Sequence, residues 1–314
     1  MSNLWYKCKA PKFESKKSKS LIHTFAIGNY AGLSINPYQG CQHRCAYCYA
    51  TYQWSPEFYD KIYAKNNAHE VLEKQLAAWK ADTIDPVMVG SATDAYQPAE
   101  LRFNLTRRCI KVLQKHNVPY YIFTKSTIID RDFELHCRYK HNCFIIWSVT
   151  TCNEKIRRIM EPGTPPAEKI FATIHKFIEA GICCGVNIDP IIPLVTDGDD
   201  AIDTILDNCK AAGLRYIFGA LLRLRGDIWE RMKLVIKLLE IPDGVDKYRR
   251  IYHFQESSLL NYVAADRRYA DLILGKLEQK IKMYGMTYGF PAHIKPKNIN
   301  KSPLMQTTLL DYLI

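Results

Sequence analysis

The sequence contains no long hydrophobic segment. None of its apolar runs approaches the roughly 18 residues that a membrane-spanning helix requires, and residues 1–7 lack the apolar core of a secretory signal. We therefore expect neither a membrane partner nor secretion. The chain carries eleven cysteines, an odd number. A tight group of thiolates would be scrambled in an oxidising compartment, so a cytoplasmic location is expected.

A second absence concerns metal ligands. Cys41, Cys45 and Cys48 occur at C-x3-C-x2-C spacing, but no further C-x-x-C or H-x3-H pair follows them. A structural zinc site needs four ligands, and His43 is poorly placed to complete a tetrahedron with these cysteines. Three thiolates can instead hold three irons of a [4Fe–4S] cluster and leave the fourth iron open. The spacing favours an iron–sulfur cluster over a zinc knuckle or a chance group of cysteines.

The net charge of +11 is concentrated at the two ends of the chain. Residues 1–20 hold six lysines and one acid, and residues 244–314 hold eleven basic and six acidic residues, whereas the middle is nearly neutral. Basic ends are consistent with binding of a polyanion such as a nucleic acid. They are equally consistent with a solvated basic face and a lysine-rich tail, and charge alone does not decide between the two.

Most of the chain alternates between apolar runs and amphipathic stretches. Strands are expected at residues 33–39, 87–94, 120–125, 143–151, 183–193 and 215–222, and helices at 67–80, 100–116, 131–140, 166–180, 199–212 and 227–240. Near-continuous apolar strands indicate a parallel sheet covered by helices. We predict an α/β fold, a partial (β/α)6 TIM-type barrel over residues 31–243. A basic N-terminal arm (1–30) precedes it, and a C-terminal extension (244–314) with one long helix (264–284) covers it.

In such a sheet the chemistry lies at the carboxyl ends of the strands, where the cysteine loop also falls. The second strand ends in the small, hydrogen-bonding turn Gly90-Ser-Ala-Thr-Asp94. A turn of this kind lets the backbone approach a ligand closely or binds an ammonium group, although an ordinary glycine turn has the same composition. Its candidate binding residues are Gly90, Ser91, Thr93 and Asp94.

Polar residues also end the next three strands. Lys125 could neutralise the carboxylate of a ligand, or it could be a surface lysine. Ser148 and Thr150 interrupt one apolar strand, and Asn187 and Asp189 interrupt another. Polar groups in such runs need partners, which a ribose, a ligand carboxylate or neighbouring backbone would supply.

The segment from Asn36 to Ala50, with its three cysteines, resembles the radical S-adenosylmethionine (SAM) enzymes of the spore photoproduct lyase family, often described as DNA repair photolyase-like. Further matches follow in the order of the chain, at residues 93–100, 124–132, 148–151, 161–163, 190–193 and 306–310. The resemblance implies a partial (β/α)6 barrel, one [4Fe–4S] cluster held by the three cysteines, bound SAM and an electron donor such as a flavodoxin or a ferredoxin.

The same resemblance assigns roles to individual residues. Lys125, Ser148 and the turn Gly90–Asp94 match positions that contact SAM. Tyr47 and Tyr49, which flank Cys48, match tyrosines of the lyase itself; they are candidates to carry a radical or a proton, or to pack on the cluster. One departure concerns the hydrogen-donor cysteine of the lyase. The matching position here lies in Ser91-Ala92, without a thiol, and this argues against thymine-dimer repair.

The leading hypothesis is a radical SAM enzyme, of lyase or transferase/isomerase type, that cleaves SAM reductively and abstracts hydrogen from a substrate. The basic ends favour a nucleic acid substrate. One alternative is the modification of a small molecule, nucleotide or peptide by the same chemistry. Another is an iron–sulfur binding protein without catalytic activity.

Overall fold

The fold is built around one large parallel sheet. The computed structural model describes residues 10–27, 30–52, 57–80, 84–255, 259–294 and 297–298. The sheet has nine strands in the order β11-β10-β9-β8-β7-β6-β3-β12, with β2 also paired to β3. The strands are β2 (Ile22–Ile27), β3 (Tyr30–Ile35), β6 (Val87–Val89), β7 (Tyr120–Thr124), β8 (Cys143–Ser148), β9 (Cys183–Ile191), β10 (Tyr216–Leu221), β11 (Thr287–Tyr288) and β12 (Lys297–Asn298).

The six strands expected from the apolar runs pair with one another in parallel, from β3 to β10. Strand β11, from the predicted C-terminal extension, adds a further parallel strand beside β10, whereas β2 and β12 run antiparallel to β3. The fold is therefore a mixed α/β structure with a parallel sheet, as predicted. Within the described residues the sheet is an open path of strands and does not close into a barrel.

A second, three-stranded sheet lies beside the first. It contains β1 (Lys12–Lys16), β5 (Lys61–Lys65) and β4 (Tyr38–Gln39), with β5 in the middle. The predicted arm thus contributes β1, all of β2 and the first residue of β3. The first predicted strand, 33–39, is divided between β3 and β4, one in each sheet. Residues 1–9, which include Cys8, and the tail motif 306–310 lie outside the described residues.

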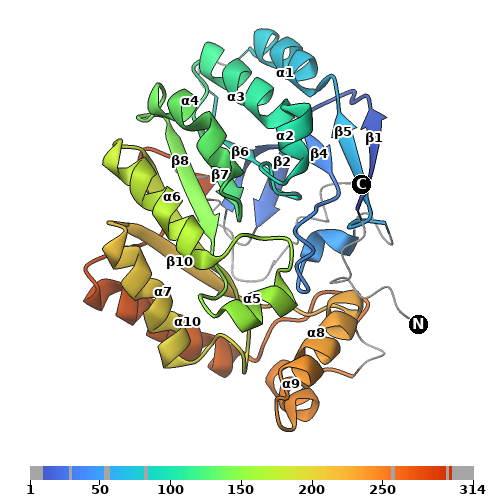
Figure 1. The fold of residues 1–314 in the computed structure, drawn as a ribbon, viewed down its shortest axis with the longest axis vertical. Helices are drawn as coiled ribbons and strands as arrows, with labels where there is room; N and C mark the ends of the chain where they lie inside the picture. Colours follow the sequence, from blue (N-terminus) through green and yellow to red (C-terminus); the bar gives the residue numbers. More distant parts are fainter. Residues whose placement is uncertain are drawn as a thin grey trace.

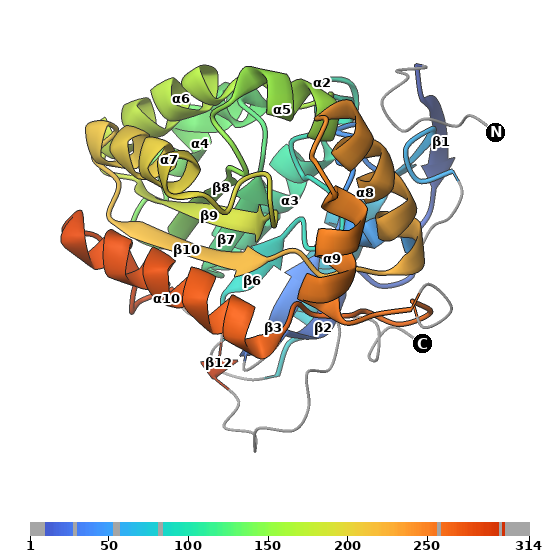
Figure 2. The same ribbon diagram turned by 90° about the horizontal axis from the view of Figure 1, so that it is seen from below.

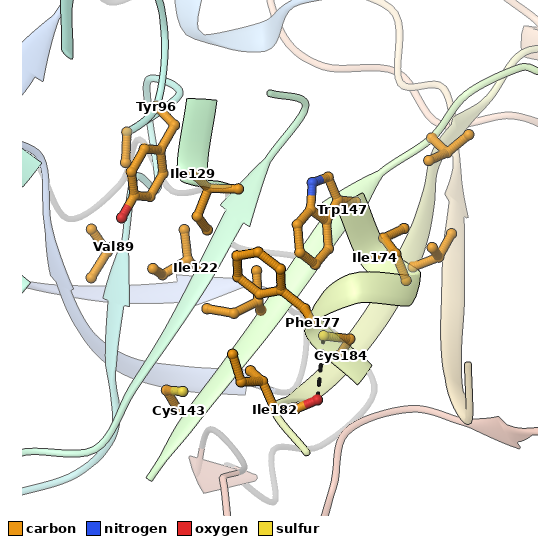
Figure 3. Close-up of a cluster of buried hydrophobic side chains, with 14 of the residues drawn as sticks. Val89, Tyr96, Ile122, Ile129, Cys143, Trp147, Ile174, Phe177, Ile182 and Cys184 are labelled. Carbon is orange, nitrogen blue, oxygen red and sulfur yellow. Dashed lines mark hydrogen bonds between the residues drawn. The ribbon is translucent and has the colours of Figure 1, made fainter. Parts of the chain in front are cut away.

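Most helices form an arc over one face of the large sheet, which we call the outer face (Figure 1). Their apolar stripes pack against the strands in the largest hydrophobic cluster of the molecule. Trp147 of β8, for example, meets Phe177 edge-on, with ring centroids 5.4 Å apart (Figure 3). The helices of this arc are α1 (Ala68–Ala77), α3 (Leu105–Lys115), α4 (Phe133–Cys137), α6 (Ala167–Glu179), α7 (Asp199–Ala211) and α10 (Arg267–Met283).

Two of the predicted helices differ from expectation. The helix predicted at 100–116 is broken into α2 (Ala99–Phe103) and α3, because Asn104 adopts a left-handed conformation with φ of 54°. The helix predicted at 227–240 is present as α8 (Gly226–Leu238) but does not cover the sheet. With α9 (Gly244–Tyr252) it lies beyond the ends of the strands, where the arrowheads of β9 and β10 point (Figure 2).

The inner face of the sheet, opposite the helices, changes character along the strands. At its amino end it is apolar and aromatic, and Phe290, which follows β11, stacks on Phe218 with centroids 4.9 Å apart. At its carboxyl end it is polar, and the cysteine loop lies there. None of the helices that the structure describes is long and apolar enough to cross a membrane.

Candidate functional site

The cysteine loop begins with a backbone turn that only glycine fits. Gly40 has a φ of +85°, and a side chain there would press on the carbonyl oxygens of Phe58 and Lys61. The next residue, Cys41, donates its backbone N–H to Phe58 O (3.1 Å). Cys41 and Cys45 are each only 8% exposed, and Cys48 is partly exposed. The three free thiols therefore lie on a loop whose path is fixed by the chain beneath it.

The turn after α5 (Glu154–Met160) holds the middle of the loop. Ala46 N–H donates to Met160 O (2.8 Å), and Gly163 N–H donates to His43 O (3.1 Å). A side chain at Gly163 would come within 2.8 Å of His43 Cα, so the two segments touch backbone to backbone. Such close packing explains why glycine follows Pro162 in this turn.

Helix α8 holds the end of the loop. Arg231 donates from Nε to Ala46 O (2.6 Å) and from Nη2 to Cys48 O (3.2 Å). The same Nη2 also reaches Thr51 Oγ1 (3.0 Å) and Asp227 Oδ2 (3.2 Å). A guanidinium can satisfy several acceptors at once in a fixed geometry, so α8 fastens the last two cysteines to the body of the protein.

The thiols have the chemistry that a cluster requires. Burial raises the pKa of the Cys41 thiol to about 12, and it raises the pKa of Cys45 well above the ordinary value. The positive charge of bound iron would supply what these thiols need to become thiolate ligands. In the part of the chain that the structure describes, no three His, Cys, Asp or Glu side chains converge closely enough to hold a single metal ion.

His43, between the first two cysteines, faces away from a ligand role. It is 2% exposed, and its Nδ1 lies 3.3 Å from Asp94 Oδ2. Burial lowers the pKa of His43, although Asp94 opposes that shift. The imidazole therefore serves to join the cysteine loop to the turn after β6.

Asp94 is occupied by partners within the protein. Its carboxylate accepts hydrogen bonds from Thr124 Oγ1 (2.8 Å) and from the backbone N–H groups of Lys125 (2.7 Å) and Tyr96 (2.8 Å). Together with His43, these contacts make it a junction between β6, β7 and the cysteine loop. In this structure Asp94 therefore fixes the shape of the turn after β6.

The rest of the predicted turn is also held by protein groups. Gly90 has a φ of +86°, and Asn36 bonds both Ser91 Oγ (2.7 Å) and Ala92 N (2.9 Å). Thr93 is 5% exposed. The turn is thus a rigid backbone feature next to the loop, and the phenol of Tyr49 donates to its Ser91 carbonyl.

A buried ion pair lies beneath the loop. Lys125 Nζ is 3.1 Å from Glu161 Oε1, 3.1 Å from Ser148 O and 3.3 Å from Thr150 Oγ1. The Tyr47 phenol also donates to Glu161 and lies 3.0 Å from Thr150 Oγ1. Four predicted site residues therefore gather near Glu161, and they are Tyr47, Lys125, Ser148 and Thr150. Glu161 precedes Pro162 in the turn that holds the cysteine loop.

The charges of this pair stabilise each other. Burial opposes ionisation of Lys125, but the Glu161 carboxylate outweighs it and raises the pKa of the ammonium group. Burial likewise acts against ionisation of Glu161, yet Lys125 and the hydrogen bonds to its oxygens lower its pKa overall. Both groups are charged at neutral pH. Sequence reasoning did not single out Glu161; the acid in the Glu161-Pro-Gly163 turn was the available signal.

Asn187 and Asp189 lie together further along the rim. Asn187 Nδ2 is 3.3 Å from Asp189 Oδ2. Asn187 is 7% exposed, and Asp189 as a whole residue is exposed although protein groups surround its carboxyl. Desolvation by the surrounding protein raises the pKa of the Asp189 carboxyl, against the Asn187 hydrogen bond and the charges of Lys125 and Arg223. This pair and the Lys125 group share one end of the sheet, as the strand order predicts.

The other cysteines that the structure describes pack into hydrophobic clusters or against them. Cys152, for instance, accepts a weak hydrogen bond from Asn208 of α7 (3.9 Å) on the outer side. These side chains are those of a small apolar residue, and they are Cys109, Cys137, Cys143, Cys152, Cys183, Cys184 and Cys209.

Known proteins share both the sequence and the fold. Residues 35–209 match the family model of the Radical SAM superfamily. An uncharacterized protein of Mycobacterium tuberculosis is 29% identical over an alignment of 264 residues that covers 78% of this chain and 76% of that protein. An uncharacterized protein of Methanocaldococcus jannaschii is 29% identical over 167 residues, covering 52% of this chain and 61% of the other.

Solved structures agree on the architecture. A double mutant of spore photoproduct lyase with bound AdoMet and a dinucleoside spore photoproduct has a TM-score of 0.69 at 14% identity, covering 92% of this chain and 85% of the other. A radical SAM methyltransferase from Sphaerobacter thermophilus has a TM-score of 0.51 at 10% identity, with coverage of 85% and 67%. The family match runs from before the cysteine loop to α7, more than half of the chain. The protein therefore belongs to the radical SAM superfamily, whose members use a [4Fe–4S] cluster and SAM, and both predicted cofactors are confirmed.

Proposed function

We propose that this protein cleaves SAM reductively and abstracts a hydrogen atom from a bound substrate. The observation that carries the proposal is the three-cysteine loop, held from both sides by α5 and α8 at the carboxyl end of a parallel sheet. Cys41, Cys45 and Cys48 would hold the cluster. A bound cluster, reduced by an external electron donor such as a flavodoxin or a ferredoxin, would supply the one-electron chemistry that splits the sulfonium of SAM into methionine and a 5′-deoxyadenosyl radical.

The polar part of the inner face is the proposed SAM site. Lys125, Ser148, Thr150 and Asn187 all lie there, beside the loop. Glu161 fixes the direction of the Lys125 ammonium group, so Lys125 would meet a ligand carboxylate from one defined position. A charge held in place before the ligand arrives loses less free energy on binding than a mobile one does.

The two tyrosines next to Cys48 have different surroundings. The phenol of Tyr47 is bonded to Glu161 and Thr150 and is buried, which supports a positioning role. Tyr49 is 42% exposed, although its phenol donates to Ser91 O. Of the two, Tyr49 is the one that a substrate can touch, and we assign to it any transfer of a proton or hydrogen atom.

A nucleic acid or nucleotide is the proposed substrate class. The similar fold of spore photoproduct lyase binds a dinucleoside, and the chain has a net charge of +11. The position matched to the hydrogen-donor cysteine holds Ser91 and Ala92, and the seven other cysteines that the structure describes pack into hydrophobic clusters. We therefore propose a reaction other than the thiol-quenched repair of a thymine dimer.

Anaerobic reconstitution with iron and sulfide tests the proposal. Dithionite and SAM are added, and 5′-deoxyadenosine is measured with and without DNA. We expect the product from the wild type and from Cys137→Ala, a partly exposed cysteine of α4 that serves as the matched control, but none from Cys45→Ala. A cluster that forms while SAM is never cleaved would instead indicate a non-catalytic iron–sulfur protein.

A further inference from the structure

Two arginines follow β10 at the rim of the candidate site. Residues 221–225 read Leu-Leu-Arg-Leu-Arg, and Leu222 and Leu224 are buried (2% and 0% exposed). Side chains alternate along an extended segment, so Arg223 and Arg225 face the other way. Leu224 forms a two-hydrogen-bond bridge with Val263 (2.9 and 2.7 Å), which fixes this segment against a second one.

The ring of Tyr262 lies within cation–π distance of both guanidinium groups. The Cζ atoms of Arg223 and Arg225 are 5.5 and 5.7 Å from its centroid. The Tyr262 phenol donates to the backbone carbonyl of Tyr49 (3.1 Å), the residue after Cys48. The two arginines are thereby held next to the cysteine loop.

Arg223 makes no ion pair with any acid of the described chain. Its neighbour Arg225 lies 3.8 Å from Asp227 Oδ1, and the positive charge of Arg223 acts to lower the pKa of Asp189. A guanidinium stacked on an aromatic ring keeps its N–H edge free for two parallel hydrogen bonds to an oxyanion. The ring also limits the motion of the side chain, so less entropy is lost when the anion binds.

We propose that Arg223, stacked on Tyr262 and supported by the charge of Arg225, binds a phosphate group of the substrate. The inference rests on the proposed function, because the phosphate belongs to the molecule presented to the radical. It narrows the substrate class to phosphate-bearing molecules, an oligonucleotide or a nucleotide. It also places the phosphate at the end of β10, on the Tyr49 side of the cysteine loop.

Binding of a fluorescein-labelled single-stranded thymidine oligonucleotide to the anaerobically reconstituted protein tests this site. We expect Arg223→Gln to raise the Kd roughly tenfold and to reduce the salt dependence of binding by about one phosphate contact. Arg223→Lys, which keeps the charge but not the planar fork, is expected to fall between Arg223→Gln and the wild type. Arg267→Gln is the matched control, because that arginine is 94% exposed at the start of α10; it should change the Kd less than about twofold.

Competition distinguishes the sources of the phosphate. Thymidine monophosphate and inorganic phosphate should displace the oligonucleotide, whereas thymidine should not. If thymidine monophosphate competes no better than inorganic phosphate, the site recognises the phosphate of the nucleic acid backbone and not the nucleoside. The proposal is overturned if the wild type binds none of the three phosphate-bearing probes, if thymidine competes as well as its monophosphate, or if Arg223→Gln and Arg267→Gln weaken binding equally. Should Arg223→Gln fail to fold, as judged by circular dichroism, Arg223→Lys decides the matter alone.

The two proposals can fail separately. Cleavage of SAM by the wild type without nucleic acid decides the radical chemistry and does not depend on Arg223. If SAM is cleaved but phosphate is not bound, only the phosphate site is wrong. If phosphate binding depends on Arg223 while SAM is never cleaved, only the catalytic proposal is wrong.

Discussion

The outer and inner faces of the large sheet are made by alternate residues of the same strands, yet they are built for different purposes. Along β8 and its continuation, Ile145, Trp147 and Val149 belong to the cluster beneath the helices, whereas Ser148 and Thr150 face the polar inner side. Period-two alternation separates the two sets. Substitutions at neighbouring residues of one strand should therefore affect either the packing of the outer face or the chemistry of the inner face, with little effect on the other.

The largest effect is expected from a pair of adjacent substitutions on β8. Trp147→Ala should lower the free energy of unfolding by about 3–5 kcal/mol, because it removes a fully buried indole. Ser148→Ala, one residue away on the inner face, should change it by less than about 1 kcal/mol but should weaken SAM binding. Urea unfolding and equilibrium dialysis with SAM measure the two quantities. An equal loss of stability in both variants would show that the faces are not separable.

A second experiment asks whether the polar inner rim also contributes to stability. Lys125→Met leaves the Glu161 carboxylate buried without its partner, so we expect a loss of about 3 kcal/mol in the free energy of unfolding. Lys125→Met/Glu161→Gln removes both charges and should recover most of that loss. The double variant should still bind SAM poorly. If the double variant is as unstable as Lys125→Met, the loss comes from packing and not from the unpaired carboxylate.

The third and smallest effect concerns a polar group within the outer layer. His136 is fully buried, and its Nδ1 and Nε2 lie 3.0 Å from Tyr120 Oη and 3.1 Å from Tyr96 Oη. Tyr120 accepts from Gln114 and Tyr96 donates to Asp132, so the neutral ring, protonated on Nε2, satisfies both neighbours. A second proton on Nδ1 would face the Tyr120 hydroxyl proton, and burial lowers the pKa of His136 to about 4.

The sign of the pH dependence follows from that shift. Between about pH 4 and the unfolded value of 6.5, the unfolded chain binds more protons than the folded one, so stability falls as the pH falls. From pH 7 to pH 5 we expect His136 to account for a loss of about 2 kcal/mol, measured by urea unfolding at each pH. His136→Gln should remove this part of the pH dependence. Exposed His141 changed to Gln is the control; if it has the same effect, the assignment to His136 is wrong.

The sequence predicted the strands well because their signal is local. Apolar runs such as 143–147 are buried on both faces at their amino ends, and such strands are recognisable from composition alone. The break at Asn104 was missed because the helical pattern continues through it, and only the left-handed backbone of one residue separates α2 from α3. The three cysteines were likewise readable because all of them lie within one short loop.

The missed site residues depend on distant partners. Glu161 acquires its role from Lys125 and Tyr47, which are 36 and 114 residues away in the chain. Asp94, which stays a predicted SAM contact, is bonded within the protein by His43, Thr124 and Lys125. Period and composition report burial of single residues, but they do not report which buried groups meet. Pairing of this kind becomes visible only when the strands are placed side by side.

The fastening of the cysteine loop by Arg231 has a consequence for how the protein is made. Ala46 and Arg231, which donates a hydrogen bond to the Ala46 carbonyl, are separated by 185 positions in the chain. A ribosome that adds 5–20 residues per second needs roughly 10 to 40 s to cover that distance. During this interval the nascent chain carries three thiols on a loop that lacks its final anchor, so insertion of iron and sulfide is best timed after synthesis of α8. Low oxygen during expression should protect the three thiols most in this interval, before Arg231 of α8 has been synthesised and can bind the loop.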